Sequence, residues 1–237
     1  MNMSPFIAEL IGTALLIYLG NGVVAGVLLK QSKSEGAGWL VICIGWALAV
    51  TFAIYMSGPI SGAHLNPAVT IGLAAVGKFS WHDVPIYIFG QLIGAIVGAV
   101  FVFLHYYPHW EKTNDPDLKL AVFCTAPAIR NPIWNFFSEF MGTFILMLGL
   151  SALGANKFAD GLNPLVVGAL IVSIGTSLGG TTGWAINPAR DLGPRIVHAI
   201  LPISGKGGSD WGYSWIPIIA PILGGTMGTL FYKLFWS

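Results

Sequence analysis

Long apolar stretches with few polar interruptions dominate this chain. Segments without Asp, Glu, Lys or Arg run from Trp39 to Val76, from Val84 to Tyr107 and from Gly161 to Ala189. Each is at or beyond the roughly twenty residues that an α-helix needs to cross a bilayer. The apolar runs and the breakers between them predict spanning helices at residues 5–29, 39–57, 84–106, 133–155, 162–180 and 215–235. The pattern therefore predicts an all-α membrane protein with six transmembrane helices.

Two further apolar stretches, 60–76 and 181–201, are too interrupted to be spans. Each opens with Gly-rich chain, and a proline follows an asparagine partway along. As a helix, residues 67–76 would cover about 15 Å, roughly half of the hydrocarbon thickness. We therefore expect two re-entrant half-helices that reach the midplane. Non-helical backbone at that depth is tolerated only when it is buried in protein or lines a watery cavity, so these segments predict an internal path.

The chain resembles itself in its two halves. Residues 6–13, FIAELIGT, return as residues 136–143, FFSEFMGT, and the tripeptide Asn-Pro-Ala occurs at 66–68 and again at 187–189. We interpret the chain as a single channel domain with a first half at 1–107, a linker at 108–131 and a second half at 132–237. With three spans in each half, the second copy enters the membrane from the opposite side. This predicts an inverted repeat whose half-helices meet at the midplane.

Composition agrees with a membrane protein and excludes several other classes. Of 237 residues, 55% are hydrophobic and only 9% are charged, against roughly a quarter charged in a soluble domain. The net charge of +1 comes with no basic block, so no nucleic-acid partner is expected. Cys43 lies in an apolar run and Cys124 in the polar linker, so no disulfide framework is expected. The first apolar segment lacks a basic stretch before it, and we expect it to be a retained helix.

The paired motifs carry the predicted chemistry. They consist of Asn66, Pro67 and Ala68, and of Asn187, Pro188 and Ala189. Asparagine as N-cap with proline at the first helical position is a strong helix start, and one copy would mean only that. Two copies in matching halves predict a pore. Half-helices that meet tip to tip would place about half a positive charge each at its centre and repel cations. The asparagine amides would donate hydrogen bonds to a passing oxygen.

The segments SGAHLNPAVT at 61–70 and NPARDLGP at 187–194 resemble the signatures of the major intrinsic protein family, the aquaporins and glycerol facilitators. The resemblance covers essentially the whole chain. It implies an aquaporin-like fold, a homotetramer in the plasma membrane with one pore per subunit, cytoplasmic termini, no cofactor, and diffusion without energy coupling. Taken alone, the lysines and arginines of the loops would place both termini outside under the positive-inside rule. The resemblance overrides that weak signal.

By resemblance, Arg190 is the arginine of the selectivity constriction, and the other constriction positions fall on Trp46, Gly175 and Trp184. Water-selective members resemble one another in having a histidine at the position of Gly175, which narrows the channel. The glycine of this chain leaves the channel wider at that point. Two indoles beside a guanidinium suit the carbon backbone and hydroxyls of glycerol. The glycine could instead serve close helix packing, and either tryptophan could be an interfacial belt residue. Glycerol facilitators more usually carry phenylalanine where this chain has Trp184, which leaves the pore width open.

Other polar residues are expected along the path. Glu9 and Glu139 are acids inside spans, and we expect each to accept backbone N–H bonds from its re-entrant loop. The alternative is a proton relay, which two isolated acids do not favour. The expected vestibule lining consists of Gly62, Ala63, His64, Gly183 and Ala185. A lone histidine such as His64 is equally suited to a structural role.

The sequence thus predicts a passive channel for glycerol, water and related small uncharged solutes that excludes ions and protons. The alternatives within this class are a water-selective pore and a broader channel for dihydroxyacetone, urea or protonated lactic acid. A secondary transporter needs an ion site, and only Asp191 offers a carboxylate near the motifs. An intramembrane enzyme needs a nucleophile with a base or a metal cluster, and the scattered histidines lack ligand spacing. We therefore expect neither catalytic activity nor a bound metal.

Overall fold

The computed structural model describes residues 3–236, and helices make up all the regular structure in this range. The elements are α1 (Pro5–Leu28), α2 (Trp39–Ser61), α3 (Pro67–Ala75), α4 (Val84–His105), α5 (His109–Lys112), α6 (Pro116–Phe123), α7 (Pro132–Gly154), α8 (Asn163–Leu178), the 3-10 turn η1 (Gly179–Thr181), α9 (Pro188–Ile200) and α10 (Ile216–Trp236). Six segments in this range are long and apolar enough to cross a membrane, namely α1, α2, α4, α7, α10 and α8 together with η1. The predicted spans are confirmed.

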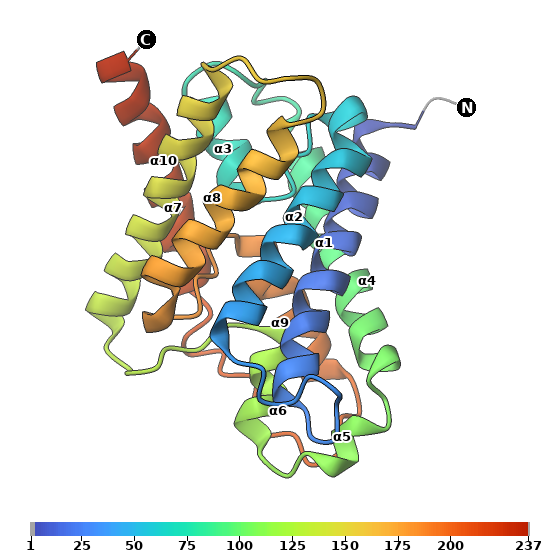
Figure 1. Cartoon of the computed structure of the whole chain (residues 1–237). Helices are drawn as coiled ribbons and strands as arrows, with labels where there is room; N and C mark the ends of the chain where they lie inside the picture. The colour runs from blue at the N-terminus through green and yellow to red at the C-terminus, as the bar shows by residue number, and fades with distance from the viewer. Residues whose placement is uncertain (1–2, 237) are drawn as a thin grey trace.

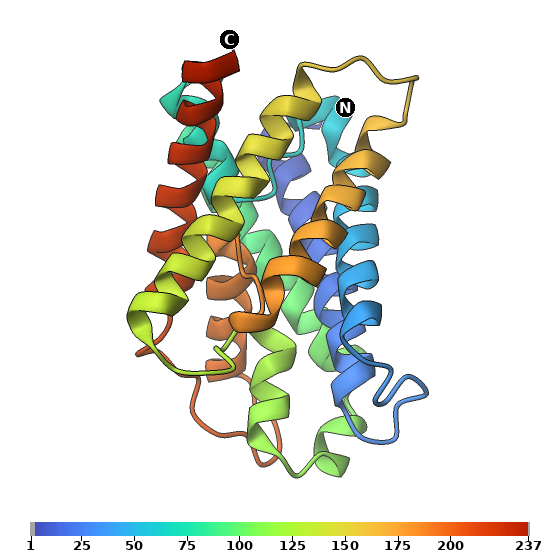
Figure 2. The same cartoon turned by 60° about the vertical axis from the view of Figure 1, so that its left-hand side comes forward.

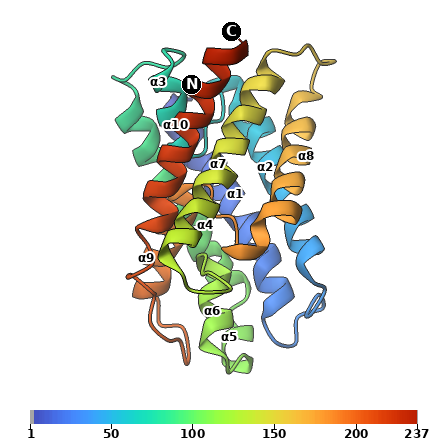
Figure 3. The ribbon, with the colours of Figure 1, turned by 90° about the vertical axis from the view of Figure 1, so that its left-hand side faces the viewer.

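The long helices stand side by side, and the start of α1 and the end of α10 lie at the same end of the bundle (Figures 1 and 2). Helices α5 and α6 lie at the opposite end, which we call the linker side. The short helices α3 and α9 occupy opposite halves of the bundle, α3 toward the termini and α9 toward the linker side (Figures 1 and 3). This is the arrangement expected for two half-helices that enter from opposite faces.

Each half-helix packs against the other half of the chain. Helix α3 makes its main contacts with α10, and α9 makes its main contacts with α4. Within each half, the first span packs closely against the last, α1 against α4 and α7 against α10. The half-helices are thus exchanged between two similar three-span units.

Glycines bring the paired spans into backbone contact at equivalent places in the two halves. A Cβ on Gly94 of α4 would lie 2.3 Å from the Leu10 carbonyl oxygen, and one on Gly224 of α10 would lie 2.1 Å from that of Phe140. The offsets are equal, 224 − 94 = 130 and 140 − 10 = 130. Side chains other than hydrogen would push these helices apart, as is general where membrane helices pack through small residues.

The end of α2 and the linker differ from the sequence prediction. Helix α2 continues past residue 57 to Ser61, because Pro59 is accommodated in its last turn and Gly62, at φ +80°, provides the left-handed C-cap. The linker contains two short helices that the hydrophobic pattern did not predict. The start of α6 carries a local signal, since Asp115 caps it by accepting a hydrogen bond from the Asp117 amide at 2.8 Å.

Candidate pore and its constriction

Two cavities run through the middle of the bundle. The midplane cavity has a volume of about 110 Å³ and is lined by Asn66 and Asn187 together with apolar side chains of α2, α7 and α8. The linker-side cavity, about 280 Å³, is lined by α1, α2, α6 and residues 124–128. Three residues line both cavities, and they are Trp46, Trp184 and Arg190. These three, which we call the boundary residues, therefore separate one cavity from the other.

The two asparagines begin the half-helices and also join them. Asn66 Oδ1 accepts a hydrogen bond from the Ala68 amide at 2.9 Å, and Asn187 Oδ1 accepts one from the Ala189 amide at 3.0 Å. Asn66 Nδ2 donates to the Ile186 carbonyl and Asn187 Nδ2 donates to the Leu65 carbonyl, both at 2.8 Å. Since a carboxamide nitrogen carries two hydrogens, each asparagine keeps one donor for the cavity that it lines.

The loops before the two asparagines have the same unusual backbone. Positive φ angles occur at Gly62 (80°), Ala63 (52°) and Leu65 (54°), and at Gly183 (84°), Trp184 (37°) and Ile186 (42°). These are the fourth, third and first positions before the asparagine in both loops. Left-handed non-glycine residues cost of order 1–3 kcal/mol each and persist only where the surroundings enforce them.

The buried acids enforce this backbone. Glu9 accepts hydrogen bonds from the backbone amides of His64 at 2.9 Å and Leu65 at 2.7 Å. Glu139 accepts from the amides of Ala185 at 3.0 Å and Ile186 at 2.9 Å. Side-chain donors complete both sites, Ser61 and Gln91 on Glu9, and Thr182 on Glu139. The carboxylates are thus engaged by the loops, which supports their structural reading over a proton relay.

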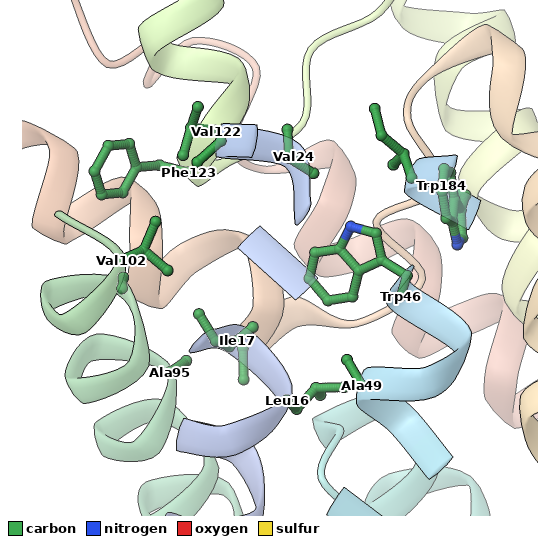
Figure 4. Packing of buried hydrophobic residues seen from close by; sticks show 14 of the residues in the cluster. Leu16, Ile17, Val24, Trp46, Ala49, Ala95, Val102, Val122, Phe123 and Trp184 are labelled. Carbon is green, nitrogen blue, oxygen red and sulfur yellow. The ribbon is translucent and has the colours of Figure 1, made fainter. Parts of the chain in front are cut away.

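The guanidinium of Arg190 lies over the ring of Trp46. The Arg190 Cζ is 4.4 Å from the centroid of the Trp46 ring, a cation–π geometry. Figure 4 shows the Trp46 ring projecting from α2 toward α1, where it covers Gly20: a Cβ there would lie 2.3 Å from the ring. Arg190 is 8% exposed, and its Nη1 has no hydrogen-bond partner among the residues that the structure describes. The guanidinium has further N–H donors, and Arg190 lines both cavities, so it can donate to a solute oxygen there.

Gly175 does not line either cavity, which changes the interpretation of its role. The Trp184 indole fills the space beside it: a Cβ on Gly175 would lie 2.9 Å from the Cζ2 of that ring. From the sequence we expected this glycine to leave room for solute, and in the structure the Trp184 ring takes the space directly beside it. Glycine leaves room for the large indole of Trp184, which can then lie back against α8.

The five predicted vestibule residues divide between the cavities. Ala63, His64 and Ala185 line the midplane cavity, and Gly183 lines the linker-side cavity. Gly62 lines neither of the two and ends α2 instead. The His64 Nδ1 lies 3.1 Å from the Thr70 hydroxyl, so the ring is held while one side faces the cavity.

Behind Arg190 lies a polar cluster that the sequence analysis missed. Asp191 and Arg195 form an ion pair at 2.8 Å with both side chains fully buried. Asp191 Oδ2 also accepts from the backbone amide of Thr125 at 2.8 Å and from its hydroxyl at 2.7 Å. Arg195 Nη1 donates to the Ser209 carbonyl at 2.8 Å. Asp191, the one candidate for an ion-coupling carboxylate, is therefore occupied in fixing α9 to the linker. The sequence could have indicated this ion pair, because Asp191 and Arg195 are four residues apart and so lie on the same face of a helix.

The cysteines and metal-ligating residues form no site in the described part of the chain. Cys43 and Cys124 are both free and buried. Burial raises the pKa of the Cys124 thiol, so it stays protonated at neutral pH. Residues 3–236 contain no group of three or more His, Cys, Asp or Glu side chains that could hold a metal ion.

Comparisons with known proteins agree over the whole chain. The family model described as "Major intrinsic protein" matches residues 1–232. The glycerol uptake facilitator protein of Bacillus subtilis is 61% identical over 231 residues, which cover 98% of this chain and 84% of that protein. Glycerol uptake facilitator protein 3 of Lactiplantibacillus plantarum is 55% identical over 96% of this chain and 95% of its own length. The X-ray structure of the aquaglyceroporin from Plasmodium falciparum superposes with a TM-score of 0.84 at 36% identity, covering 96% of this chain and 94% of that one.

Proposed function

Because this chain belongs to the major intrinsic protein family, we propose that its two cavities form one passive pore that conducts glycerol, water and related small uncharged solutes. The protein is a multi-pass membrane channel and not an enzyme. The relatives named as glycerol uptake facilitators support glycerol as the principal solute.

The single observation that carries the proposal is the set of boundary residues. Trp46, Trp184 and Arg190 are the residues that the two cavities share, so a solute moving between the cavities passes them. The indoles offer apolar surface to a carbon backbone, and the guanidinium donates to hydroxyl oxygens. Glycerol has carbon on one side and hydroxyls on the other, and it fits this division. We propose these three as the constriction, with Gly175 acting through the position of the Trp184 indole.

Exclusion of ions follows from charge and lost hydration. Arg190 is positively charged, and the N-termini of α3 and α9 both point their partial positive charge at the midplane cavity. A cation would leave its water shell to meet these charges. Asn66 and Asn187 offer donors at the same level and would orient a passing oxygen, which interrupts a chain of proton-conducting waters, as in aquaporin-type pores generally.

We further propose, on the strength of family membership, a homotetramer in the plasma membrane with cytoplasmic termini. In that orientation the linker-side cavity opens to the outside, and the constriction is the first narrow point met by an entering solute. Cross-linking in native membranes and cysteine labelling of the 108–131 linker from outside test the assembly and the orientation separately.

Stopped-flow light scattering on proteoliposomes tests the function. Vesicles with the channel should shrink faster than empty vesicles under an impermeant osmolyte, and they should re-swell rapidly in glycerol. Addition of a proton gradient should leave the glycerol rate unchanged, since diffusion is uncoupled. Water flux without glycerol re-swelling would refute the glycerol assignment and favour a water-selective pore, and a gradient-dependent rate would favour a transporter.

A further inference from the structure

The Trp184 indole lies in a slot on α8 and η1. Glycines form its floor, because a Cβ on Gly175 would lie 2.9 Å from the Trp184 Cζ2 and one on Gly179 would lie 2.5 Å from its Cε3. These glycines are four residues apart, one helical turn, and so present one continuous bare strip of backbone. Alanine at either position would displace the ring.

Trp39 forms the wall of this slot. Its ring meets that of Trp184 at 77° with the centroids 4.8 Å apart, an edge-to-face contact. The Trp39 Nε1 donates a hydrogen bond to the Gly175 carbonyl at 3.1 Å. A Cβ on Gly179 would also lie 3.0 Å from the Trp39 Cζ2. Trp39 therefore contacts both the glycines that form the slot and the Trp184 ring that lies in it.

The backbone of Trp184 is already fixed by other contacts. Its φ of +37° is held from the following residue, since Glu139 accepts the Ala185 amide hydrogen bond. What remains free is the side-chain torsion, which decides whether the indole lies against α8 or swings toward Arg190. The slot sets that torsion, and Trp39 is its one aromatic wall among the described contacts of Trp184.

From these contacts we infer that Trp39 is a positioning residue for the constriction: it holds the Trp184 indole against Gly175 and Gly179 and thereby sets the pore width. This inference rests on the proposed function for its meaning in transport. Trp39 lies at the first turn of α2, 40% exposed, and lines the linker-side cavity. An interfacial anchor would need neither the hydrogen bond to Gly175 nor the contact with Trp184. Trp39 therefore determines which solutes pass without itself standing at the narrowest point.

The test compares polyols of rising size in proteoliposomes that contain Trp39→Ala, Trp39→Phe or a control, Trp81→Ala. Trp81 is 59% exposed in the loop between α3 and α4 and lies in neither cavity. The readout is the ratio of erythritol to glycerol permeability, which does not depend on how many channels fold. Trp39→Ala releases the indole, which can then swing toward Arg190 and narrow the passage, and we expect this ratio to fall by about threefold or more, as loss of an aromatic contact and a hydrogen bond allows. Trp39→Phe keeps a ring but loses the hydrogen bond, and we expect a smaller fall.

Several outcomes overturn the inference. An unchanged or higher ratio in Trp39→Ala does so, and so does a proportional fall for every solute, which leaves the ratio unchanged and reports only fewer folded channels. An equal fall of the ratio in Trp81→Ala also does so. A cryo-electron microscopy map of Trp39→Ala provides a readout independent of transport: we expect the Trp184 ring to leave the slot, and a ring still in place refutes the inference. If the unaltered protein conducts no polyol, the proposed function fails while this structural test still decides the role of Trp39.

Discussion

Removal of the Glu139 carboxylate tests whether the second re-entrant loop is held by a single buried acid. In Glu139→Ala, the amides of Ala185 and Ile186 and the hydroxyl of Thr182 lose their acceptor. Glu139 is 1% exposed, so water does not readily replace it. The loop that loses its anchor carries Trp184 and leads directly into Asn187, and damage should therefore appear in transport as well as in stability.

The magnitude follows from the donors left behind. A buried donor without a partner costs about 1–3 kcal/mol, and the hydroxyl of Thr182 can rotate toward another acceptor whereas the two amides cannot. The two amides together cost about 2–6 kcal/mol. The left-handed residues Trp184 and Ile186 store strain of order 1–3 kcal/mol each, which the carboxylate now offsets. Without the carboxylate, the stranded amides and the backbone strain both disfavour the present loop. We therefore expect the loop to relax into another conformation in Glu139→Ala.

Two measurements check this prediction. Thermal unfolding in detergent should show Glu139→Ala clearly less stable, with Glu139→Gln between it and the unaltered protein because the amide keeps one acceptor oxygen. Glycerol permeability per reconstituted channel should fall by at least about tenfold in Glu139→Ala, the effect expected from roughly 1.4 kcal/mol. Thr143→Val is the matched control, since its buried hydroxyl donates to the Glu139 carbonyl and its loss strands no donor. Normal glycerol flux with normal stability in Glu139→Ala would show that the loop holds its shape unaided.

Three further predictions concern the rest of the site and its scaffold. Arg190→Ala should raise the permeability of larger polyols and admit ions, measured by re-swelling and by conductance, and an unaltered solute ranking would remove Arg190 from the constriction. Arg195→Met leaves the buried charge of Asp191 unpaired and should cost about 3–5 kcal/mol of unfolding free energy; an unchanged melting temperature would contradict the cost assigned to that charge. Gly224→Ala forces α10 away from α7 and should cost about 1–3 kcal/mol, whereas Gly22→Ala, with nothing within 4 Å of its Cβ, should be neutral in the same melting assay.

The sequence was most informative where a local rule acts. The motifs at 66–68 and 187–189 predict helix starts because the asparagine cap and the following proline are chemical properties of the tripeptide itself. The structure shows α3 and α9 beginning at Pro67 and Pro188. The six spans could be predicted equally well, since the bilayer thickness sets the length of the apolar run that a spanning helix needs. The end of α2 was missed because Pro59 looks like a breaker, although transmembrane helices tolerate proline where neighbouring groups satisfy the freed backbone.

Contacts between distant segments could not be predicted in this way. The ion pair of Asp191 and Arg195 gains its meaning only from Thr125, which the linker brings from far along the chain. The role of Trp39 could not be predicted either. From the sequence it resembles any interfacial tryptophan, and only the structure shows its contact with Trp184. Nor could the neighbour of Gly175 be predicted, because the sequence does not tell which side chain fills the space beside a glycine.

The exchange of half-helices between the repeats bears on how the channel is made in the cell. During synthesis α3 emerges long before α10, its main neighbour, and α9 finds α4 already inserted. An N-terminal fragment ending in the linker would hold a short helix with its chief packing surface missing. Co-expression of the two fragments should rescue each from degradation, because either alone lacks the element that covers its re-entrant segment.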